Sequence, residues 1–131
     1  MRTLPLAMFT SLISIAVCAA EPRKAEHPAE VALIIEEGSW SYRQFPTNLP
    51  LYVFDGDQDG KVSCIAGCAL RWPLLKAPAD SKRIGDWTVI DREDGKKQWA
   101  YKGRPVYTRF HDSIEKPTGD GIEGEWHLLV P

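Results

Sequence analysis

Two cysteines, Cys64 and Cys68, lie four residues apart in the middle of the chain. On one helical turn this spacing puts the two Cα atoms about 6 Å apart, which a disulfide can bridge. In an oxidising compartment we expect that bond to form. The alternatives are a redox-active dithiol or a copper or zinc site, which would need His111 or His127 nearby. Neither Cys-x2-Cys redox spacing nor a Cys-x2-Cys-His haem attachment site occurs.

Three aspartates in segment 55–60, Asp55, Asp57 and Asp59, resemble the first half of a calcium-binding loop. Carboxylates this close repel one another, and a bound cation would relieve the repulsion. However, the twelfth position of such a loop, which should supply a bidentate glutamate, is Ala66. We therefore expect no EF-hand site. The sequence predicts a solvated acidic turn, with a weak surface calcium site as the alternative.

Signatures of common enzyme classes are missing from the sequence. It contains no Gly-x-Ser-x-Gly elbow, no His-Glu-x-x-His pair and no phosphate-binding glycine loop. His111 and Asp112 are neighbours, but adjacent strand residues point to opposite faces, so they do not form a catalytic dyad. We predict a protein that is not an enzyme and has no cofactor.

Residues 1–20 have the anatomy of a secretory signal peptide. Arg2 supplies a positive end, the segment 6–17 is mostly apolar, and Cys18 to Ala20 are small. The apolar run is too short to cross a bilayer as a permanent helix. Cleavage after Ala20 would give a periplasmic or secreted protein. The alternative is lipidation at Cys18, the one route to a membrane, but the valine before it is bulky for such a site.

The remaining residues divide into a spacer and one domain. Residues 21–30 are charged, include two prolines and have no apolar periodicity, which predicts a disordered spacer. Residues 31–131 contain all five tryptophans and all four tyrosines, enough for a single core. The formal net charge of the chain is −2, which argues against nucleic acid as a partner. The sequence identifies no other partner.

The apolar pattern and the turn residues predict about seven short strands and one short helix. The helix is expected to begin at a cap formed by Ser63 and to extend through Leu70. Pro73 prevents it from continuing further. Asp94 and Gly95 form a predicted hairpin turn. The strands are expected near 31–35, 40–42, 51–54, 87–90, 98–101, 106–110 and 126–130. The fold class is therefore mainly antiparallel β.

The order of aromatic and acidic residues in the first part of this domain recurs in the second. The first set is Trp40, Tyr42, Tyr52, Asp57 and Trp72, and the second is Trp99, Tyr101, Tyr107, Asp112 and Trp126. The second tyrosines, the aspartates and the last tryptophans of the two sets are 54 or 55 residues apart. The Trp-x-Tyr segments are 59 residues apart, and an insertion around 44–47 explains this larger separation. We predict two similar antiparallel β units of about 50 residues, 31–78 and 87–131, packed as a single domain. The predicted aromatic core consists of the six other aromatic residues of these two sets, Trp40, Tyr42, Trp72, Trp99, Tyr101 and Trp126.

These residues also carry a family resemblance. The segments Tyr52-x4-Asp57 and Tyr107-x4-Asp112, with CIAGCALRWPLL at 64–75 and DGKKQWAYKGRPVY at 94–107, resemble a bacterial secreted repeat family. Its members are often described as predicted lipoproteins with a Tyr-x4-Asp motif. The resemblance covers nearly all of 31–131, and it implies export, a repeated β unit and no assigned function. The second copy has no cysteine pair matching the first.

The Tyr-x4-Asp segments have two physical interpretations. In the first, each tyrosine packs in the core while Asp57 and Asp112 cap turns through backbone N–H groups. In the second, both aspartates face a cleft shared by the copies, where they bind a ligand or, with raised pKa values, serve a hydrolase. We predict an exported, non-catalytic envelope module, structural or ligand-binding. The alternative is a periplasmic metal- or redox-handling protein that uses Cys64 and Cys68.

Overall fold

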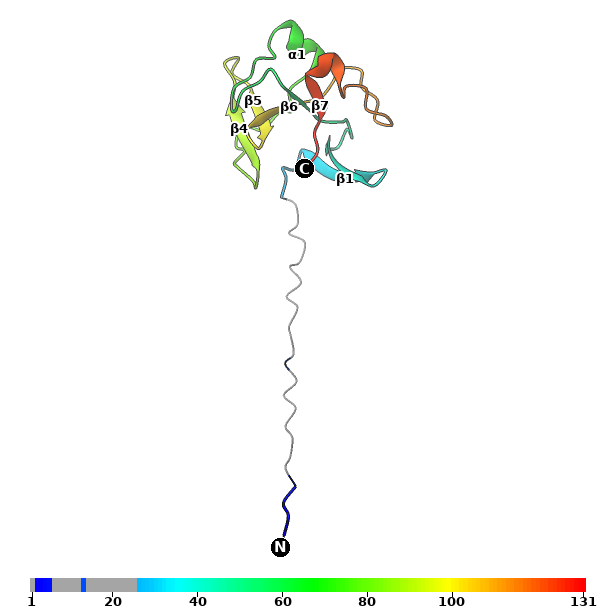
Figure 1. Ribbon diagram of the computed structural model, residues 1–131. Helices are drawn as coiled ribbons and strands as arrows, with labels where there is room; N and C mark the ends of the chain where they lie inside the picture. The colour runs from blue at the N-terminus through cyan, green and yellow to red at the C-terminus, as the bar shows by residue number, and fades with distance from the viewer. Residues whose placement is uncertain (1, 6–12, 14–25) are drawn as a thin grey trace.

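A computed structural model describes residues 2–5, 13 and 26–131 (Figure 1). The predicted signal peptide lies mostly outside these residues, as does 21–25 of the predicted spacer. Within the described ranges, none of the helices has the length and apolar character needed to cross a membrane.

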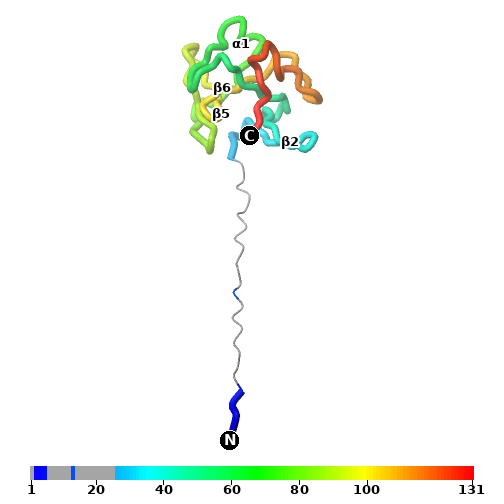
Figure 2. Tube along the Cα trace, in the orientation of Figure 1, coloured from blue at the N-terminus to red at the C-terminus, as the bar shows by residue number. Residues whose placement is uncertain are grey.

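Short strands dominate the described part of the chain, which confirms the mainly β fold class. Strands β1 and β2 form one antiparallel sheet, and the others form a second sheet in the order β4-β5-β6-β3-β7. The β1–β2 hairpin and the C-terminus lie at the end of the fold opposite α1 (Figures 1 and 2). The elements in chain order are β1 (Val31–Glu36), β2 (Ser39–Gln44), β3 (Tyr52–Phe54), α1 (Gly67–Arg71), β4 (Trp87–Asp91), β5 (Lys97–Tyr101), β6 (Arg104–Tyr107), the 3-10 turn η1 (Ile122–Gly124) and β7 (Trp126–Leu128). We call residues 31–78 the first half and 87–131 the second half.

Two-residue turns set the register of two hairpins. Glu37 and Gly38, between β1 and β2, have φ values of 49° and 81°. Lys102 and Gly103, between β5 and β6, have φ values of 48° and 81°. Positive φ at both central positions matches the right-handed twist of the flanking strands, and glycine adopts it without strain.

The hairpins β1–β2 and β4–β5 each contain a Trp-x-Tyr segment, but the two segments are offset by two residues in the structure. Leu129 O accepts a hydrogen bond from Tyr42 N, and its repeat equivalent Leu75 O accepts one from Trp99 N. The neighbouring residues agree, because Arg43 bridges to Pro50 as Ala100 pairs with Pro105. Tyr42, rather than Trp40, therefore occupies the position equivalent to Trp99.

The two halves are joined by strand pairing. Strand β3 of the first half pairs antiparallel with β6 of the second half, and Tyr52 lies opposite Tyr107. The closing segment of each half then pairs with the other half: Leu128 in β7 lies opposite Tyr52, and Leu74 forms an isolated bridge to Tyr107. These reciprocal pairings are the ones expected from a local two-fold axis that passes between Tyr52 and Tyr107.

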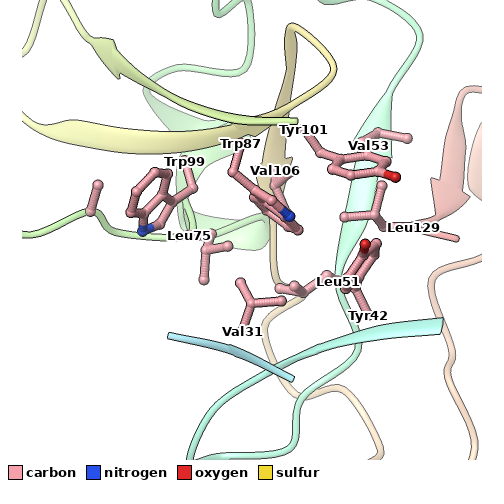
Figure 3. Packing of buried hydrophobic residues seen from close by; sticks show 11 residues of the cluster. Val31, Tyr42, Leu51, Val53, Leu75, Trp87, Trp99, Tyr101, Val106 and Leu129 are labelled. Carbon is pink, nitrogen blue, oxygen red and sulfur yellow. The ribbon is translucent and has the colours of Figure 1, made fainter. Parts of the chain in front are cut away.

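The larger hydrophobic cluster draws side chains from both halves (Figure 3). Trp87 is fully buried, and the ring of Tyr42 meets it edge-on at 5.2 Å. Tyr101 packs against both rings, at 5.2 Å from Tyr42 and 5.0 Å from Trp87. Neither hairpin could cover this aromatic surface alone, so burial in this cluster favours the association of the halves.

Three sequence-based expectations are wrong in detail. Trp40 is 51% exposed, although its counterpart Trp99 is only 3% exposed, so Trp40 does not join the aromatic core. The helix begins at Gly67, because Ser63 bonds to Asp57 instead of capping the helix. Residues 26–30 are not a disordered spacer: Pro28 is buried, and the backbone oxygen of Glu30 accepts a hydrogen bond from Phe45 N.

Candidate functional site

The four Tyr-x4-Asp residues lie together where the halves meet, but they pair across the halves. The hydroxyl of Tyr52 donates to Oδ2 of Asp112 at 2.6 Å. The hydroxyl of Tyr107 donates to Oδ2 of Asp57 at 2.7 Å. Both tyrosines are fully buried. Each tyrosine therefore bonds to the aspartate of the other half, and we call these contacts the crossed Tyr–Asp pairs.

The second oxygen of each aspartate holds the loop that follows it. Oδ1 of Asp57 accepts from the backbone N and the hydroxyl of Ser63, at 2.7 and 2.9 Å. Oδ1 of Asp112 accepts from the backbone N and the hydroxyl of Thr118, at 2.9 and 2.6 Å. The capping residue comes six positions after the aspartate in both halves. The core tyrosine and turn-capping aspartate of the first interpretation are therefore present, with a connection between halves that it did not include.

Two tryptophans stack face to face between the crossed pairs. The rings of Trp72 and Trp126 lie 3.6 Å apart and only 2° from parallel. Tyr52 meets Trp72 edge-on at 5.4 Å, and Tyr107 meets Trp126 in the same way at 5.3 Å. This matched geometry indicates that the local two-fold relation extends to the side chains. Phe54 also stacks on Trp126, at 4.5 Å, and we call the stack of these three rings the tryptophan column.

Close packing around Tyr52 requires a glycine in the opposing loop. A Cβ atom on Gly119 would lie 2.7 Å from the Tyr52 ring. Because Gly119 has no Cβ atom, its backbone N can approach the Tyr52 hydroxyl and donates a hydrogen bond to it at 3.1 Å. The hydroxyl thus accepts one hydrogen bond and donates another, and its polar capacity is met in a buried place.

The ionisation states of these groups suit a structural pairing. Burial, with the hydrogen bond to Asp112, raises the pKa of Tyr52 well above its usual value. Burial and the bond to Asp57 do the same to the pKa of Tyr107. For Asp112, burial alone would raise the pKa, but hydrogen bonds from Thr118, Tyr52 and Ser113 together lower it. Near neutral pH each tyrosine is a neutral donor, and Asp112 is an ionised acceptor.

The lowered pKa of Asp112 predicts a loss of stability in acid. A carboxyl with a depressed folded-state pKa stabilises the fold above its unfolded value of about 3.9, and this contribution disappears as pH falls through the folded pKa. We expect the Tm to fall below about pH 4, and to fall less steeply in Asp112→Asn, which lacks the titrating group. Calorimetric melts of both proteins from neutral pH downward check this. Parallel curves for the two proteins would contradict the assignment.

The predicted disulfide between Cys64 and Cys68 is present just before and within α1. Cys64 is 1% exposed and packs with Tyr52, Trp72, Tyr107 and Trp126. In the second half, η1 occupies the place of α1, and Ile122 packs against the same cluster as Cys68. The disulfide therefore fastens one of two similar supports of the tryptophan column.

Removing this disulfide should have a modest effect. The ring it closes is short, so the loop-entropy model gives a loss of about 2 kcal/mol in the free energy of unfolding. We expect Cys64→Ser/Cys68→Ser to remain folded with a lower urea midpoint. Urea titration monitored by tryptophan fluorescence measures the change, with wild-type protein under reducing conditions as the matched comparison. A loss above 5 kcal/mol would show that the bond does more than support the column.

The weak calcium candidates are engaged elsewhere. Asp55 forms an ion pair with Arg104 at 3.1 Å and a contact with His127 Nε2 at 2.6 Å. Asp57 belongs to a crossed pair, and the side chain of Asp59 lies beside Gly103. Among the described residues, no group of three or more His, Cys, Asp or Glu side chains is placed to hold a metal.

A groove of about 320 Å³ opens beside the tryptophan column, and we call it the Trp-pair groove. Trp72 and Trp126 line it, and Arg109 lies 5.7 Å from the centre of the Trp72 ring. Its other lining residues are Phe54, Cys68, Arg71, Phe110, Ile122 and Glu123. Sequence reasoning did not find this groove. Asp57 and Asp112 do not line it, so it is not the shared acidic cleft of the second interpretation.

Residues 88–130 match a protein family described as a secreted repeat of unknown function. The predicted resemblance to a secreted repeat family is confirmed over this segment, which begins within β4 and extends past β7. The description supports an exported location and assigns no activity. Neither a curated protein nor a solved structure matches the chain.

Proposed function

Taking residues 88–130 as a copy of the secreted repeat, we propose that this protein is an exported, non-catalytic binding module. Its ligand is a small molecule with an anionic group on an apolar or aromatic body, and its binding site is the Trp-pair groove. The observation that carries this proposal is the composition of that groove, which is lined by two arginines, one glutamate and four aromatic side chains.

The use of the acidic side chains supports a non-catalytic role. Each oxygen of Asp57 and of Asp112 already accepts at least one hydrogen bond from the protein. Their tyrosine partners are buried and keep raised pKa values. A general acid or base must reach a substrate and exchange protons with it. The crossed Tyr–Asp pairs meet neither condition, so we assign them to structure.

The Trp-pair groove can supply both contacts that such a ligand needs. Arg71 is exposed at the C-terminal end of α1, and Arg109 keeps part of its guanidinium free because only Nη1 bonds to Thr118. Guanidinium groups bind carboxylate, sulfonate and phosphate groups through charge-assisted hydrogen bonds. Phe110, which is 60% exposed, adds an apolar wall on the same side. Burial of that ring by a ligand would be favourable.

A pair of fluorescent probes tests the site. We expect the anionic probe 8-anilinonaphthalene-1-sulfonate to bind the folded protein in a saturable way with one site. The uncharged analogue N-phenyl-1-naphthylamine should bind at least fivefold more weakly. Arg71→Gln should weaken binding of the sulfonate about tenfold and leave binding of the neutral probe unchanged. Fluorescence titration of the full mature chain measures both.

The matched control for this titration is Arg83→Gln, which removes the same charge from an exposed position outside the groove. Its effect on sulfonate affinity should be less than twofold. The proposal fails if both probes bind equally well, or if the Arg71 and Arg83 variants behave alike.

The proposal also includes the location of the protein and the N-terminus of its mature chain. We assign it to the periplasm or the exterior as a soluble chain beginning at Glu21. Intact mass spectrometry of protein recovered from the producing cells should give the mass of residues 21–131. A mass carrying diacylglycerol on Cys18 would instead establish a lipid anchor and contradict this assignment.

One observation favours a second candidate function, because Cys68 lines the Trp-pair groove. A redox or metal-handling role would use this cysteine with Cys64. Alkylation without prior reduction, followed by mass analysis, distinguishes the two functions. Binding-module function predicts no alkylated cysteine and no stoichiometric copper, zinc or haem, whereas free thiols or bound metal would favour the second function.

A further inference from the structure

Trp40 and Trp99 each begin a Trp-x-Tyr segment, but their surroundings differ. Trp99 is 3% exposed, and its Nε1 donates to Oε2 of Glu30 at 3.1 Å. The segment before β1 thus covers Trp99. Trp40 is 51% exposed and lines a surface groove. The fold therefore buries one member of the pair and leaves the other open to a partner.

The groove beside Trp40 has a volume of about 640 Å³, larger than the Trp-pair groove, and we call it the Trp40 groove. Leu128, Val130 and Pro117 provide apolar walls opposite the β1–β2 hairpin. Ile35, which is cross-strand to Trp40 and 58% exposed, extends the apolar surface at the hairpin end. Exposed apolar area of this kind, rimmed by charged residues, is typical of an interaction surface.

The charge of the rim indicates the chemistry of the partner. Glu36, Glu37 and Glu115 line the groove, together with a single basic residue, Lys116. Glu36 is neutralised from within the fold, because both its oxygens accept from Nη2 of the buried Arg43 at 2.7 Å. The salt bridges found within 26–131 do not include Glu37 or Glu115. These two exposed carboxylates are therefore available to a cation.

We propose that the Trp40 groove binds a lysine-rich segment of another exported protein. An alkylammonium group over the indole face gains a cation–π contact, and the two carboxylates bind the same or a neighbouring ammonium. The methylene stem of lysine matches the apolar walls. This site is separate from the Trp-pair groove, whose arginines select the opposite charge. The proposal does not depend on the proposed function.

A hexalysine peptide is the probe for this surface. Calorimetric titration should show binding that weakens as salt is raised, because exposed charges are screened. Trp40→Ala should reduce the affinity at least tenfold, and Glu37→Gln/Glu115→Gln at least fivefold. In spectra of ¹⁵N-labelled protein, the indole N–H signal of Trp40 should move most among the five tryptophans.

The charge-matched control is Glu93→Gln/Glu125→Gln, which removes two exposed carboxylates away from the groove. It should change the affinity less than twofold, and every variant should keep the wild-type Tm within a few degrees. Unchanged peptide binding in Trp40→Ala, or an equal loss in the control pair, would overturn the proposal. So would sedimentation showing that the protein dimerises through Trp40, because the occupant would then be a second copy.

Discussion

Trp126→Ala is expected to lower the free energy of unfolding by about 3–5 kcal/mol, the range for truncating a buried large aromatic side chain. Trp126 is 2% exposed and lies at the centre of the aromatic column, between Trp72 at 3.6 Å and Phe54 at 4.5 Å. Its loss removes two stacked contacts and the edge contact with Tyr107. Because the column is formed by both halves, we expect a single cooperative urea transition at a much lower midpoint.

Trp40→Ala is the matched control, since it deletes the same side chain from a position that is 51% exposed. Its cost should be below about 1 kcal/mol, as for most surface substitutions. A comparable loss in the two variants would show that the column has no special role. A two-step transition in Trp126→Ala would show that the halves fold independently.

Asp112→Ala should produce the second large effect, a loss of about 3 kcal/mol or more. The substitution leaves the Tyr52 hydroxyl without its acceptor in a fully buried place. It also removes the acceptor for Thr118 N, Thr118 Oγ1 and Ser113 N. Hydrogen bonds to a charged group contribute about 1.5–3 kcal/mol each, but bonds to one carboxylate are not additive. Urea titration at pH 7 measures the loss.

Asp80→Ala, at an exposed loop position, is the control for loss of a carboxylate and should lie within about 0.5 kcal/mol of wild type. Tyr52→Phe in the Asp112→Ala background should recover part of the loss, because it removes the orphaned hydroxyl. If Asp112→Ala were as mild as Asp80→Ala, the crossed Tyr–Asp pairs would not stabilise the fold.

Much of the fold could be predicted because local signals agreed with one another. Runs of apolar and β-branched residues predicted the strands, and Asp94 and Gly95 predicted the turn between β4 and β5. The four-residue cysteine spacing in an exported chain gave the disulfide. The recurrence of aromatic residues predicted two similar units, and the reciprocal strand pairings of the two halves agree with it.

The sequence could not reveal which tyrosine bonds to which aspartate. Each motif contains both partners, so pairing within a motif and pairing between motifs are equally compatible with the spacing. The antiparallel register of β3 and β6 decides the outcome, because it places Tyr52 opposite Tyr107 and brings each toward the loop of the other half. Such a long-range pairing leaves no local signal in the chain.

The position of Trp40 was missed for a related reason. The repeat predicts the same register for Trp40 and Trp99, but the structure places Tyr42 at the position equivalent to Trp99. Tyr42 and Trp99 are both buried in the larger hydrophobic cluster, whereas Trp40 lies two residues nearer the turn between β1 and β2. The sequence does not reveal this offset, because both segments have the same Trp-x-Tyr spacing.

A double-mutant cycle tests the central claim, that the two halves are joined by the crossed Tyr–Asp pairs. Tyr52→Phe and Asp112→Asn should show a coupling energy of about 1 kcal/mol or more in the free energy of unfolding. Tyr52→Phe and Asp57→Asn, which belong to the same motif but do not bond, should add within about 0.5 kcal/mol. We expect coupling only between residues of different halves. Coupling between Tyr52 and Asp57, with additivity between Tyr52 and Asp112, would contradict the crossed pairing.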